Sequence, residues 1–372
     1  MGAGDLITFR APGRVNLIGE HTDYNAGFVM PAAINVSAYT SVTPREDRKL
    51  KIRSDNFEDE IVVDLDDATL KARSHWSDYP VGVALTLERA GYRLRGAQLE
   101  IKSDVPMGSG LSSSAAVEVS TACALAAHSD HAIDRKELAL LCQRAENEFV
   151  GARVGIMDQF VALFGEERKA LMLDCRSLDY KLLPVPETVR LVVCNTMVKH
   201  ALASGAYNER RAECEAGAKY LARFLPHVKT LRDVTLSDLE QYGRDLPEVI
   251  YRRCLHVITE NARVLAAAEA LEQDDLHRFG EMMAESHVSL RDDYEVSSRE
   301  LDLMVELAVG VEGVYGTRMT GGGFGGCTIN LVDADHVDRF QRTVAEGYEQ
   351  ITSLKPEIYV CEASKGAEQI TS

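Results

Sequence analysis

The sequence predicts an α+β fold, because segments typical of strands and of helices follow one another without a regular βαβ alternation. Short segments with β-branched residues and flanking turn residues characterise the first half of the chain. Longer segments with helical spacing characterise the second half. The length of 372 residues is enough for two domains, each with its own core.

The elements of the first half are strands, followed by helices. Alternating and β-branched residues predict strands at SAYTSVTP (37–44), LKIRSDN (50–56), QLEIKSDVP (98–106), ALMLDC (170–175) and RLVVCNT (190–196). A run of small apolar residues at 115–128 predicts a packed helix. Asp134, with Glu137 three residues later, predicts the N-terminal cap of a helix that extends to about Phe149.

The second half is richer in helices. Helical spacing is found at 207–224, 250–272, 274–289 and 298–309, and strands are expected at CTINLV (327–332) and EIYVCEA (357–363). The weakest periodicity lies near 178–186, where two prolines occur. We therefore expect an N-terminal α+β domain, residues 1–180, and a C-terminal α+β domain, residues 181–372.

The composition excludes several classes of protein. The net charge is −17, with 58 acidic and 41 basic residues, so a nucleic-acid partner is not expected. No apolar stretch is long enough to span a membrane, and no signal peptide is visible. Eight widely spaced cysteines without metal-binding spacing indicate reduced thiols. We expect a cytoplasmic protein, and a monomer.

Two glycine-rich stretches are candidates for phosphate binding. GGGFGG (321–326) matches GxGxxG, but it leads into an expected strand rather than a helix, which disfavours a dinucleotide site. Two other interpretations of GGGFGG remain: a tight turn, or a glycine loop whose backbone packs against a ligand. MGSGLSSSAAVEVS, from Met107, follows a strand and opens a helix, so its N–H groups favour an anion. Serine capping of the helix is the structural alternative.

Charged residues gather at two places. GRVNLIGEHTDYNAG (13–27) brings together Arg14, Glu20, His21 and Asp23, which fits a solvated turn, a metal site or a pocket for a hydroxyl-rich ligand. Asp158 lies in an apolar, glycine-containing stretch, and a partly buried carboxylate needs a partner or a task. Arg14 is a possible partner of Asp158, and helix capping is the alternative.

Several segments together resemble the GHMP small-molecule kinases, and within them the galactokinases. PGRVNLIGEHTDYN resembles the galactokinase signature, VPMGSGLSSSAA the ATP loop, and RMTGGGFGGC the third motif. GIMDQF, DCRSL, AYNERRAECE and ESHVSLRDDYEVS are similar as well, so the resemblance extends over about residues 9 to 365. It implies a two-domain fold with the active site in the cleft between the domains.

The resemblance also implies an activity, the phosphorylation of D-galactose at its C1 hydroxyl by ATP with Mg²⁺. Asp158 would be the catalytic base, with Arg14 beside it, and Ser114 and Glu146 would hold the metal. The galactose hydroxyls would be bound by Glu20, His21, Asp23, Gly155 and Tyr207. The ATP phosphates would be bound by Gly108, Ser109, Gly110, Leu111, Ser112, Ser113 and Ser114.

Alternatives to this activity remain open. A related kinase of the same superfamily could act on N-acetylgalactosamine, galacturonate or arabinose, because the sequence does not reveal the pocket around C2 and C6. A non-catalytic galactose and ATP sensor is disfavoured, because the Ser114-Ala115 dipeptide, which some sensors lose, is intact. Trp76, the one tryptophan, fits a place near the adenine or in the core.

Overall fold

The computed structural model describes residues 7–199 and 203–370. The contacts divide the chain into two compact units. Unit 1 contains Met1–Arg14, Ala33–Glu166 and Ser364–Ser372, and unit 2 contains Val15–Ala32 and Glu167–Ala363. The expected division into residues 1–180 and 181–372 stays a prediction. The contacts add that a short N-terminal segment packs with the C-terminal half, and that the last residues pack with the N-terminal half.

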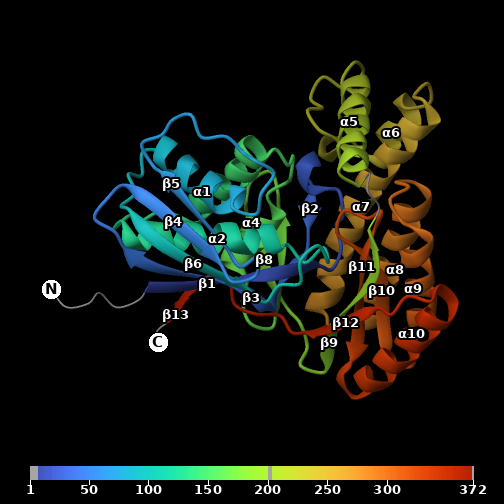
Figure 1. The fold of residues 1–372 in the computed structure, drawn as a ribbon. Helices are drawn as coiled ribbons and strands as arrows, with labels where there is room; N and C mark the ends of the chain where they lie inside the picture. The colour runs from blue at the N-terminus through green and yellow to red at the C-terminus, as the bar shows by residue number, and fades with distance from the viewer. Residues whose placement is uncertain (1–6, 200–202, 371–372) are drawn as a thin grey trace. The chain divides into compact units, whose positions relative to one another are not determined.

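Unit 1 is a sheet with helices on one face (Figure 1). Its strands are β1 (Ile7–Asn16), β3 (Pro31–Pro44), β4 (Lys49–Ser54), β5 (Asp59–Asp64), β6 (Ala97–Ser103) and β13 (Glu368–Ile370), in the spatial order β13-β1-β3-β6-β4-β5. Its helices are α1 (Asp78–Arg89), α2 (Ser113–His128), α3 (Arg135–Arg144), the π-helical turn η2 (Ala145–Val150) and α4 (Met157–Phe164). Helix α2 contacts β6, and the buried Thr40 of β3 is 2.9 Å from Ser120 of α2, hydroxyl to hydroxyl.

Unit 2 contains two smaller sheets and the remaining helices. The four-stranded antiparallel sheet has the order β10-β11-β9-β12, and the three-stranded sheet has the order β2-β7-β8. The strands are β2 (Phe28–Val29), β7 (Lys169–Asp174), β8 (Tyr180–Pro184), β9 (Val189–Lys199), β10 (Val314–Thr320), β11 (Gly325–Asp333) and β12 (Glu357–Cys361). The helices are η1 (Asp23–Asn25), α5 (Ala203–Leu221), η3 (Leu231–Asp233), α6 (Leu236–Tyr242), α7 (Glu248–Glu272), α8 (Leu276–Asp292), α9 (Arg299–Val309), η4 (Ala334–His336) and α10 (Val337–Thr352).

Two buried clusters form the core of unit 2. One cluster joins α5 and α7 to the segment after α8, with the fully buried Leu221, Val257 and Tyr294 among its members. The other cluster packs α9 and α10 against the four-stranded sheet through residues such as Met304 and Phe340. Burial of such apolar side chains stabilises each cluster.

The α+β class and the strands and helices that the sequence predicts are confirmed, with shifts of a few residues at their ends. Asp134 caps α3 by accepting hydrogen bonds from the N–H groups of Lys136 and Glu137. That helix does not continue regularly to Phe149, because a π-helical turn begins at Ala145. Strand β1 and the helices α1, α4 and α10 are additional elements.

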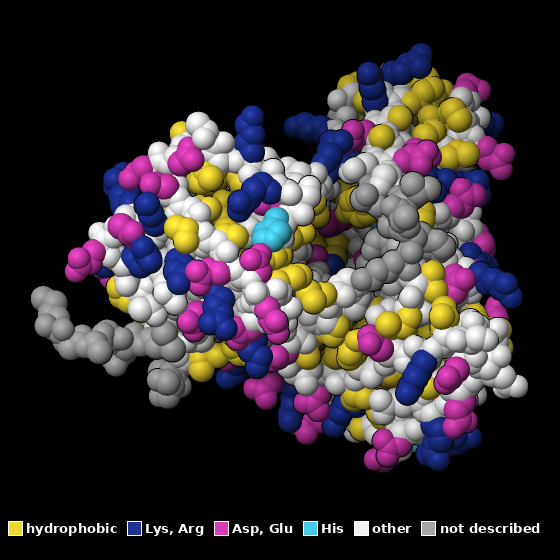
Figure 2. Space-filling model, in the orientation of Figure 1, with side chains coloured by type: hydrophobic (Ala, Val, Ile, Leu, Met, Phe, Trp, Pro, Cys, Tyr) yellow, Lys and Arg dark blue, Asp and Glu magenta, His cyan; other side chains and the backbone are white. Residues whose placement is uncertain are grey.

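The surface and the thiols agree with the composition. Figure 2 shows acidic and basic side chains interspersed on the visible surface. All eight cysteines are free, and six of them are buried. Within the described residues, every helix is too short or too polar to cross a lipid bilayer.

Candidate active site

The glycine and serine loop lies between β6 and α2 in unit 1. Gly108 and Gly110 have φ angles of +68° and +78°, which glycine adopts without a steric penalty. Ser112, the residue before α2, makes no side-chain cap to the helix. The first N–H groups of this 16-residue helix are therefore open to another acceptor, and the positive end of its dipole favours an anion.

Arg14 of β1 holds this loop in place. Its backbone N–H donates to the carbonyl of Leu111 at 3.0 Å, and its Nη1 donates to the carbonyl of Gly110 at 2.6 Å. The side chain of Arg14 is 9% exposed. A buried guanidinium needs partners for its donors, and two of its contacts fix the backbone of the loop.

Two further donors of Arg14 pair with Asp158, the partner that the sequence suggests. Nε donates to Oδ1 at 2.7 Å and Nη2 donates to Oδ2 at 2.6 Å. This bidentate geometry is the strong form of a carboxylate pair. The Ser112 hydroxyl also donates to Asp158 Oδ2. Asp158 lies in the first turn of α4, where the helix dipole favours its negative charge.

A second group of polar side chains lies in the interior of unit 1. Gln159, the residue after Asp158, donates through Nε2 to Glu118 at 3.0 Å and to Glu146 at 2.7 Å. Burial, followed by the charge of Asp158, raises the pKa of Glu146 to about 7, and hydrogen bonds from Ser114 and Gln159 oppose this rise. Burial and the charge of Glu146 raise the pKa of Glu118 well above its usual range.

These residues could hold a divalent metal that takes its remaining ligands from water or from a phosphate. Glu146 and Ser114 supply hard oxygen donors, which Mg²⁺ prefers, and one oxygen of the buried Glu118 has no hydrogen-bond partner among the described residues. Within the described part of the chain, no group of three or more His, Cys, Asp or Glu side chains is arranged to hold a metal alone. A metal at Glu146 would therefore complete its shell with water or with phosphate oxygens.

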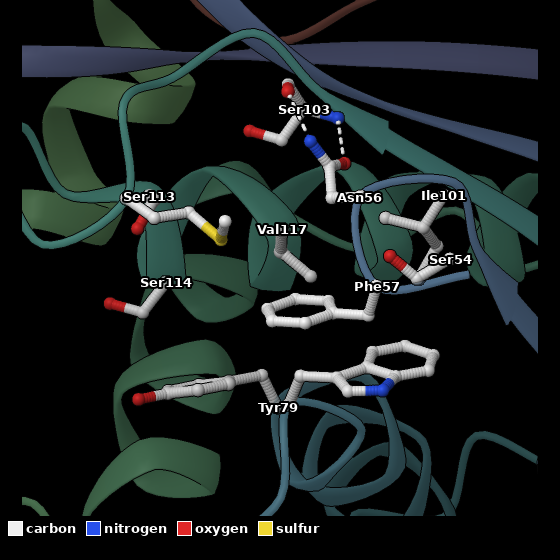
Figure 3. A pocket seen from close by; sticks show the side chains of 11 residues that line it. Ser54, Asn56, Phe57, Tyr79, Ile101, Ser103, Ser113, Ser114 and Val117 are labelled. Carbon is white, nitrogen blue, oxygen red and sulfur yellow. Dashed lines mark hydrogen bonds between the residues drawn. The ribbon is translucent and has the colours of Figure 1, made fainter. Parts of the chain in front are cut away.

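A pocket opens beside the start of α2 (Figure 3). Phe57 and Trp76 stack in it with ring centroids 5.7 Å apart and an interplanar angle of 7°. Trp76 is half-buried, and its Nε1 donates to Asp59 at 3.1 Å. Tyr79, Met107, Ser113, Ser114 and Val117 complete much of the wall. Trp76 therefore lines a pocket that reaches the glycine and serine loop, rather than filling the core.

Glu20 belongs to unit 2, where it is 2% exposed. Its Oε1 accepts hydrogen bonds from Gly321 N at 2.7 Å and from Thr320 Oγ1 at 3.1 Å, and lies 3.4 Å from Nη2 of the buried Arg318. Its Oε2 accepts from Asn16 Nδ2 at 2.8 Å. Glu20 therefore fixes the start of the 321–326 turn, which joins β10 to β11 and confirms that this stretch opens a strand.

His21, also in unit 2, is held in an unusual conformation. Its φ is +63°, a region that few residues other than glycine occupy. Burial, followed by the charge of His256, lowers the pKa of His21 to about 3, so the imidazole is neutral at physiological pH. Its Nδ1 is 2.8 Å from the hydroxyl of Tyr24. Its Nε2 is buried and has no hydrogen-bond partner among the described residues.

The other expected sugar-binding residues lie in both units. Asp23 is half-buried at the start of η1, and its Oδ1 accepts from the N–H of Tyr24 at 2.9 Å. The Tyr207 ring lies 5.5 Å from the His21 ring. Gly155 is buried and belongs to unit 1, just before α4.

The structure thus groups the expected residues into two sets. Unit 1 brings together Arg14, Asp158, Glu146 and the loop 108–114, and unit 2 brings together Glu20, His21 and Tyr207. Sequence reasoning missed several polar partners of these sets, namely Glu118, Gln159, Arg318, Tyr24 and Tyr294. Two of these residues could have been found from the sequence, because Gln159 directly follows Asp158 and Arg318 lies just before the glycine turn.

Comparisons with known proteins give one consistent family. The model described as "Galactokinase galactose-binding signature" matches residues 2–44, "GHMP kinases N terminal domain" matches 78–166 and "GHMP kinases C terminal" matches 267–350. The chain is 49% identical to a galactokinase of Chloroflexus aurantiacus, covering 96% of this chain and 92% of that protein. It is 46% identical to a galactokinase of Roseiflexus, and the match covers 98% of this chain and 93% of that protein.

Solved structures agree with these matches. The galactokinase of Lactococcus lactis, complexed with galactose, matches with a TM-score of 0.95 and 38% identity, covering 99% of this chain and 96% of that one. A mevalonate kinase matches with a TM-score of 0.63 and 16% identity, which shows a shared fold alone.

The buried histidines of unit 2 make a pH dependence of stability testable. The pKa of His21 is lowered to about 3 and that of His256 to about 4, so the unfolded chain binds protons that the folded chain excludes. The free energy of unfolding should therefore fall as the pH decreases below about 6.5. In His21→Asn the slope should become shallower by up to about 1.4 kcal/mol per pH unit.

Urea denaturation of both proteins at several pH values would measure this slope. Asparagine suits the test because it tolerates positive φ. The exposed His277 gives the control, since His277→Asn should leave the slope of the wild type unchanged. An equal slope in His21→Asn and the wild type would contradict the prediction.

Proposed function

The chain belongs to the galactokinases of the GHMP kinase family, and from this premise we propose how its own residues transfer a phosphoryl group from ATP to galactose. The observation that carries the proposal is the bidentate Arg14–Asp158 pair, which is held against the phosphate-binding loop by Gly110 and Ser112. The side chain of Asp158 is thereby held next to a loop whose backbone favours an anion.

The phosphates of ATP bind to the loop 108–114 and to the N-terminus of α2. The supporting observations are the open N–H groups of α2 and the positive φ angles of Gly108 and Gly110. Backbone donors and a helix dipole are the means by which proteins without a lysine in the loop hold phosphate. The hydroxyls of Ser113 and Ser114 lie at the wall of the adjoining pocket, so they can guide the triphosphate out of it.

The pocket with Phe57 and Trp76 takes the adenine base. Its wall is mostly apolar, and its aromatic pair offers a flat surface on which a base can stack. Stacking of a base on an aromatic ring contributes about 1–3 kcal/mol. The hydrogen bond from Trp76 to Asp59 fixes the indole in the pocket wall.

Asp158 is the catalytic base, and Arg14 orients its carboxylate through two hydrogen bonds. The carboxylate accepts the proton of the C1 hydroxyl while the C1 oxygen bonds to the γ-phosphorus and the bond to the leaving ADP breaks. Positioning and charge stabilisation dominate phosphoryl transfer. Arg14 also supplies positive charge beside the transferring group. Ser112 donates to the second oxygen of Asp158, which orients the carboxylate.

The sugar hydroxyls are bound by Glu20, His21, Asp23, Gly155 and Tyr207. Two observations in unit 2 support this assignment. Glu20 Oε2 accepts one hydrogen bond, from Asn16, which leaves it capacity for a sugar hydroxyl. His21 Nε2 lacks a partner among the described residues, and an unsatisfied buried nitrogen is costly until a ligand completes it.

A kinase of this family that uses ATP requires a divalent metal, and we propose that the metal is Mg²⁺, held by Ser114 and Glu146. The metal would neutralise phosphate charge when it is bound. The buried Glu146 carboxylate, with its pKa raised to about 7, is a group whose ionisation a cation would favour. The free thiols support a cytoplasmic location.

The activity is tested with a panel of sugars and MgATP, with ADP release as the readout. We expect galactose to give the highest kcat/KM. If N-acetylgalactosamine, galacturonate or arabinose gives a higher kcat/KM, that sugar is the preferred substrate instead of galactose. Binding of galactose without ADP release would indicate a sensor instead of an enzyme.

Replacement of Asp158 tests the catalytic base. Asp158→Asn keeps the shape of the side chain but removes its ability to take a proton, so kcat should fall by about 10²–10⁴-fold. Galactose affinity, measured by calorimetry, should change far less. Asp245→Asn, at an exposed position of unit 2, is the control and should keep the kcat of the wild type. A near-normal kcat in Asp158→Asn would exclude Asp158 as the base.

Replacement of Glu146 tests the metal site. Glu146→Gln and Ser114→Ala should each raise the Mg²⁺ concentration needed for half-maximal activity, because each loses one oxygen ligand. Direct Mn²⁺ binding to the protein with an ATP analogue, followed by electron paramagnetic resonance, should weaken in parallel. The exposed Glu148 lies on the same π-helical turn, so Glu148→Gln is a matched control. Unchanged Mg²⁺ and Mn²⁺ titrations in both variants would assign the metal elsewhere.

A further inference from the structure

Four side chains of unit 2 form a continuous hydrogen-bonded chain that ends at His21. His21 Nδ1 is 2.8 Å from the Tyr24 hydroxyl, which is 2.8 Å from the Tyr294 hydroxyl, which is 3.0 Å from Cys214 Sγ. Tyr294 and Cys214 are almost completely buried, at 0% and 1% exposure. We call these four residues the His21 relay. The proposed phosphoryl transfer uses none of its three hydrogen bonds.

Counting protons selects one form of the imidazole. If His21 carries its proton on Nδ1, the relay has four protons for three contacts, and one buried proton has no place in the chain. If His21 carries its proton on Nε2, three protons serve three contacts. In that form Cys214 donates to Tyr294, Tyr294 donates to Tyr24, and Tyr24 donates to Nδ1.

The chemistry of the two ends favours the same direction. An imidazole nitrogen is a strong acceptor, whereas a thiol sulfur is a weak one, so the phenol protons point toward His21. Burial raises the pKa of Cys214 to about 11, so its S–H proton is present and available to donate.

The surroundings of His21 agree with a proton on Nε2. Nε2 of His21 is buried and has no hydrogen-bond partner among the described residues, so it is open to a ligand oxygen. Nδ1 is already occupied by Tyr24, so the free donor position is Nε2. Burial, and after it the nearby His256, Arg210 and Arg318, lower the pKa of His21 to about 3 and so oppose a second proton on the ring.

We propose that Tyr24, Tyr294 and Cys214 are positioning residues, which hold His21 in the Nε2–H tautomer so that it donates a hydrogen bond to a sugar oxygen. This inference rests on the proposed role of His21 in sugar binding. It adds a specificity rule, because the sugar oxygen that meets His21 must act as an acceptor. Replacing the hydroxyl at that carbon with fluorine keeps a hydrogen-bond acceptor, whereas replacing it with hydrogen removes the acceptor.

The tautomer can be observed without any substrate. Long-range ¹H–¹⁵N correlation spectra of protein labelled with ¹⁵N-histidine separate protonated from unprotonated ring nitrogens. The chain has ten histidines, and the signals that vanish in His21→Asn assign His21. We expect a protonated Nε2 and an unprotonated Nδ1. A protonated Nδ1 would overturn the inference whether or not the protein phosphorylates galactose.

Galactose is then added to the same sample. We expect the His21 Nε2–H signals to shift, since the donor gains an acceptor. Signals of His21 that stay unchanged at saturating galactose would refute the sugar contact. ADP release in the same preparation reports separately on the proposed function, so the two failures can be told apart.

Variants test the positioning role. Tyr24→Phe removes the donor to Nδ1, so both tautomers should be populated, and the KM for galactose should rise by about 3- to 10-fold with a smaller change in kcat. Tyr294→Phe should give a weaker effect that disappears when Tyr24→Phe is already present. Tyr348→Phe is the matched control, because Tyr348 is buried and donates to the carbonyl of Thr196, outside the relay. A tautomer and a KM that are unaffected by Tyr24→Phe would contradict the role of the relay.

The specificity rule is tested with deoxy and deoxyfluoro galactoses. At one hydroxyl position, the fluoro sugar should keep more of the galactose kcat/KM than the deoxy sugar, and His21→Asn should remove this difference. If the fluoro and deoxy sugars lose equal activity at every position, His21 does not act as a donor.

Discussion

The contacts of Arg14 are the interaction on which unit 1 depends. One buried guanidinium joins three parts of the chain that are far apart in sequence, namely strand β1, the loop at Gly110 and helix α4 at Asp158. A charge this buried is tolerable only when it is paired and hydrogen-bonded. The same pairing that stabilises the unit therefore also fixes the distance between the glycine and serine loop and the carboxylate, so the stability of the unit and the geometry of the proposed site have one physical cause.

Glu20 plays the same structural part in unit 2 that Arg14 plays in unit 1, because it joins segments that are far apart in the sequence. Its carboxylate joins the N-terminal segment 15–32 to the turn after β10, through Gly321 and the buried Arg318. Since Val15 follows Arg14 directly in β1, one short stretch of sequence supplies the central charged group of each unit. Arg14 and Glu20 thus have separate structural partners, and the buried His21 contacts Tyr24, so the stretch from 14 to 23 is not simply a solvated turn.

The sequence predicts local features well, and it predicts long-range partners poorly. Loop 108–114 could be predicted because glycines directly before a helix are a local sequence pattern. Asp158 could be predicted because a carboxylate among apolar residues is expected to have a partner. The relay of Tyr24, Tyr294 and Cys214 was not predictable, since its members are up to 270 positions apart and no spacing rule links them. The packing of 15–32 with the C-terminal half is equally non-local. The π-helical turn at Ala145 was missed because it differs from an α-helix by one residue, although it directs Glu146 into the interior.

The charge balance of the chain supports the proposal of a cation at this site. With a net charge of −17, the field of the whole protein opposes a triphosphate. Locally, the charges of Arg14 and Asp158 balance each other. Burial and the charge of Glu146 raise the pKa of Glu118 well above its usual range. The N-terminus of α2 supplies only about half a unit of positive charge, which is far less than the charge of a triphosphate. In the proposed site, a divalent metal between Glu146 and the phosphates supplies the positive charge that the helix dipole alone cannot provide.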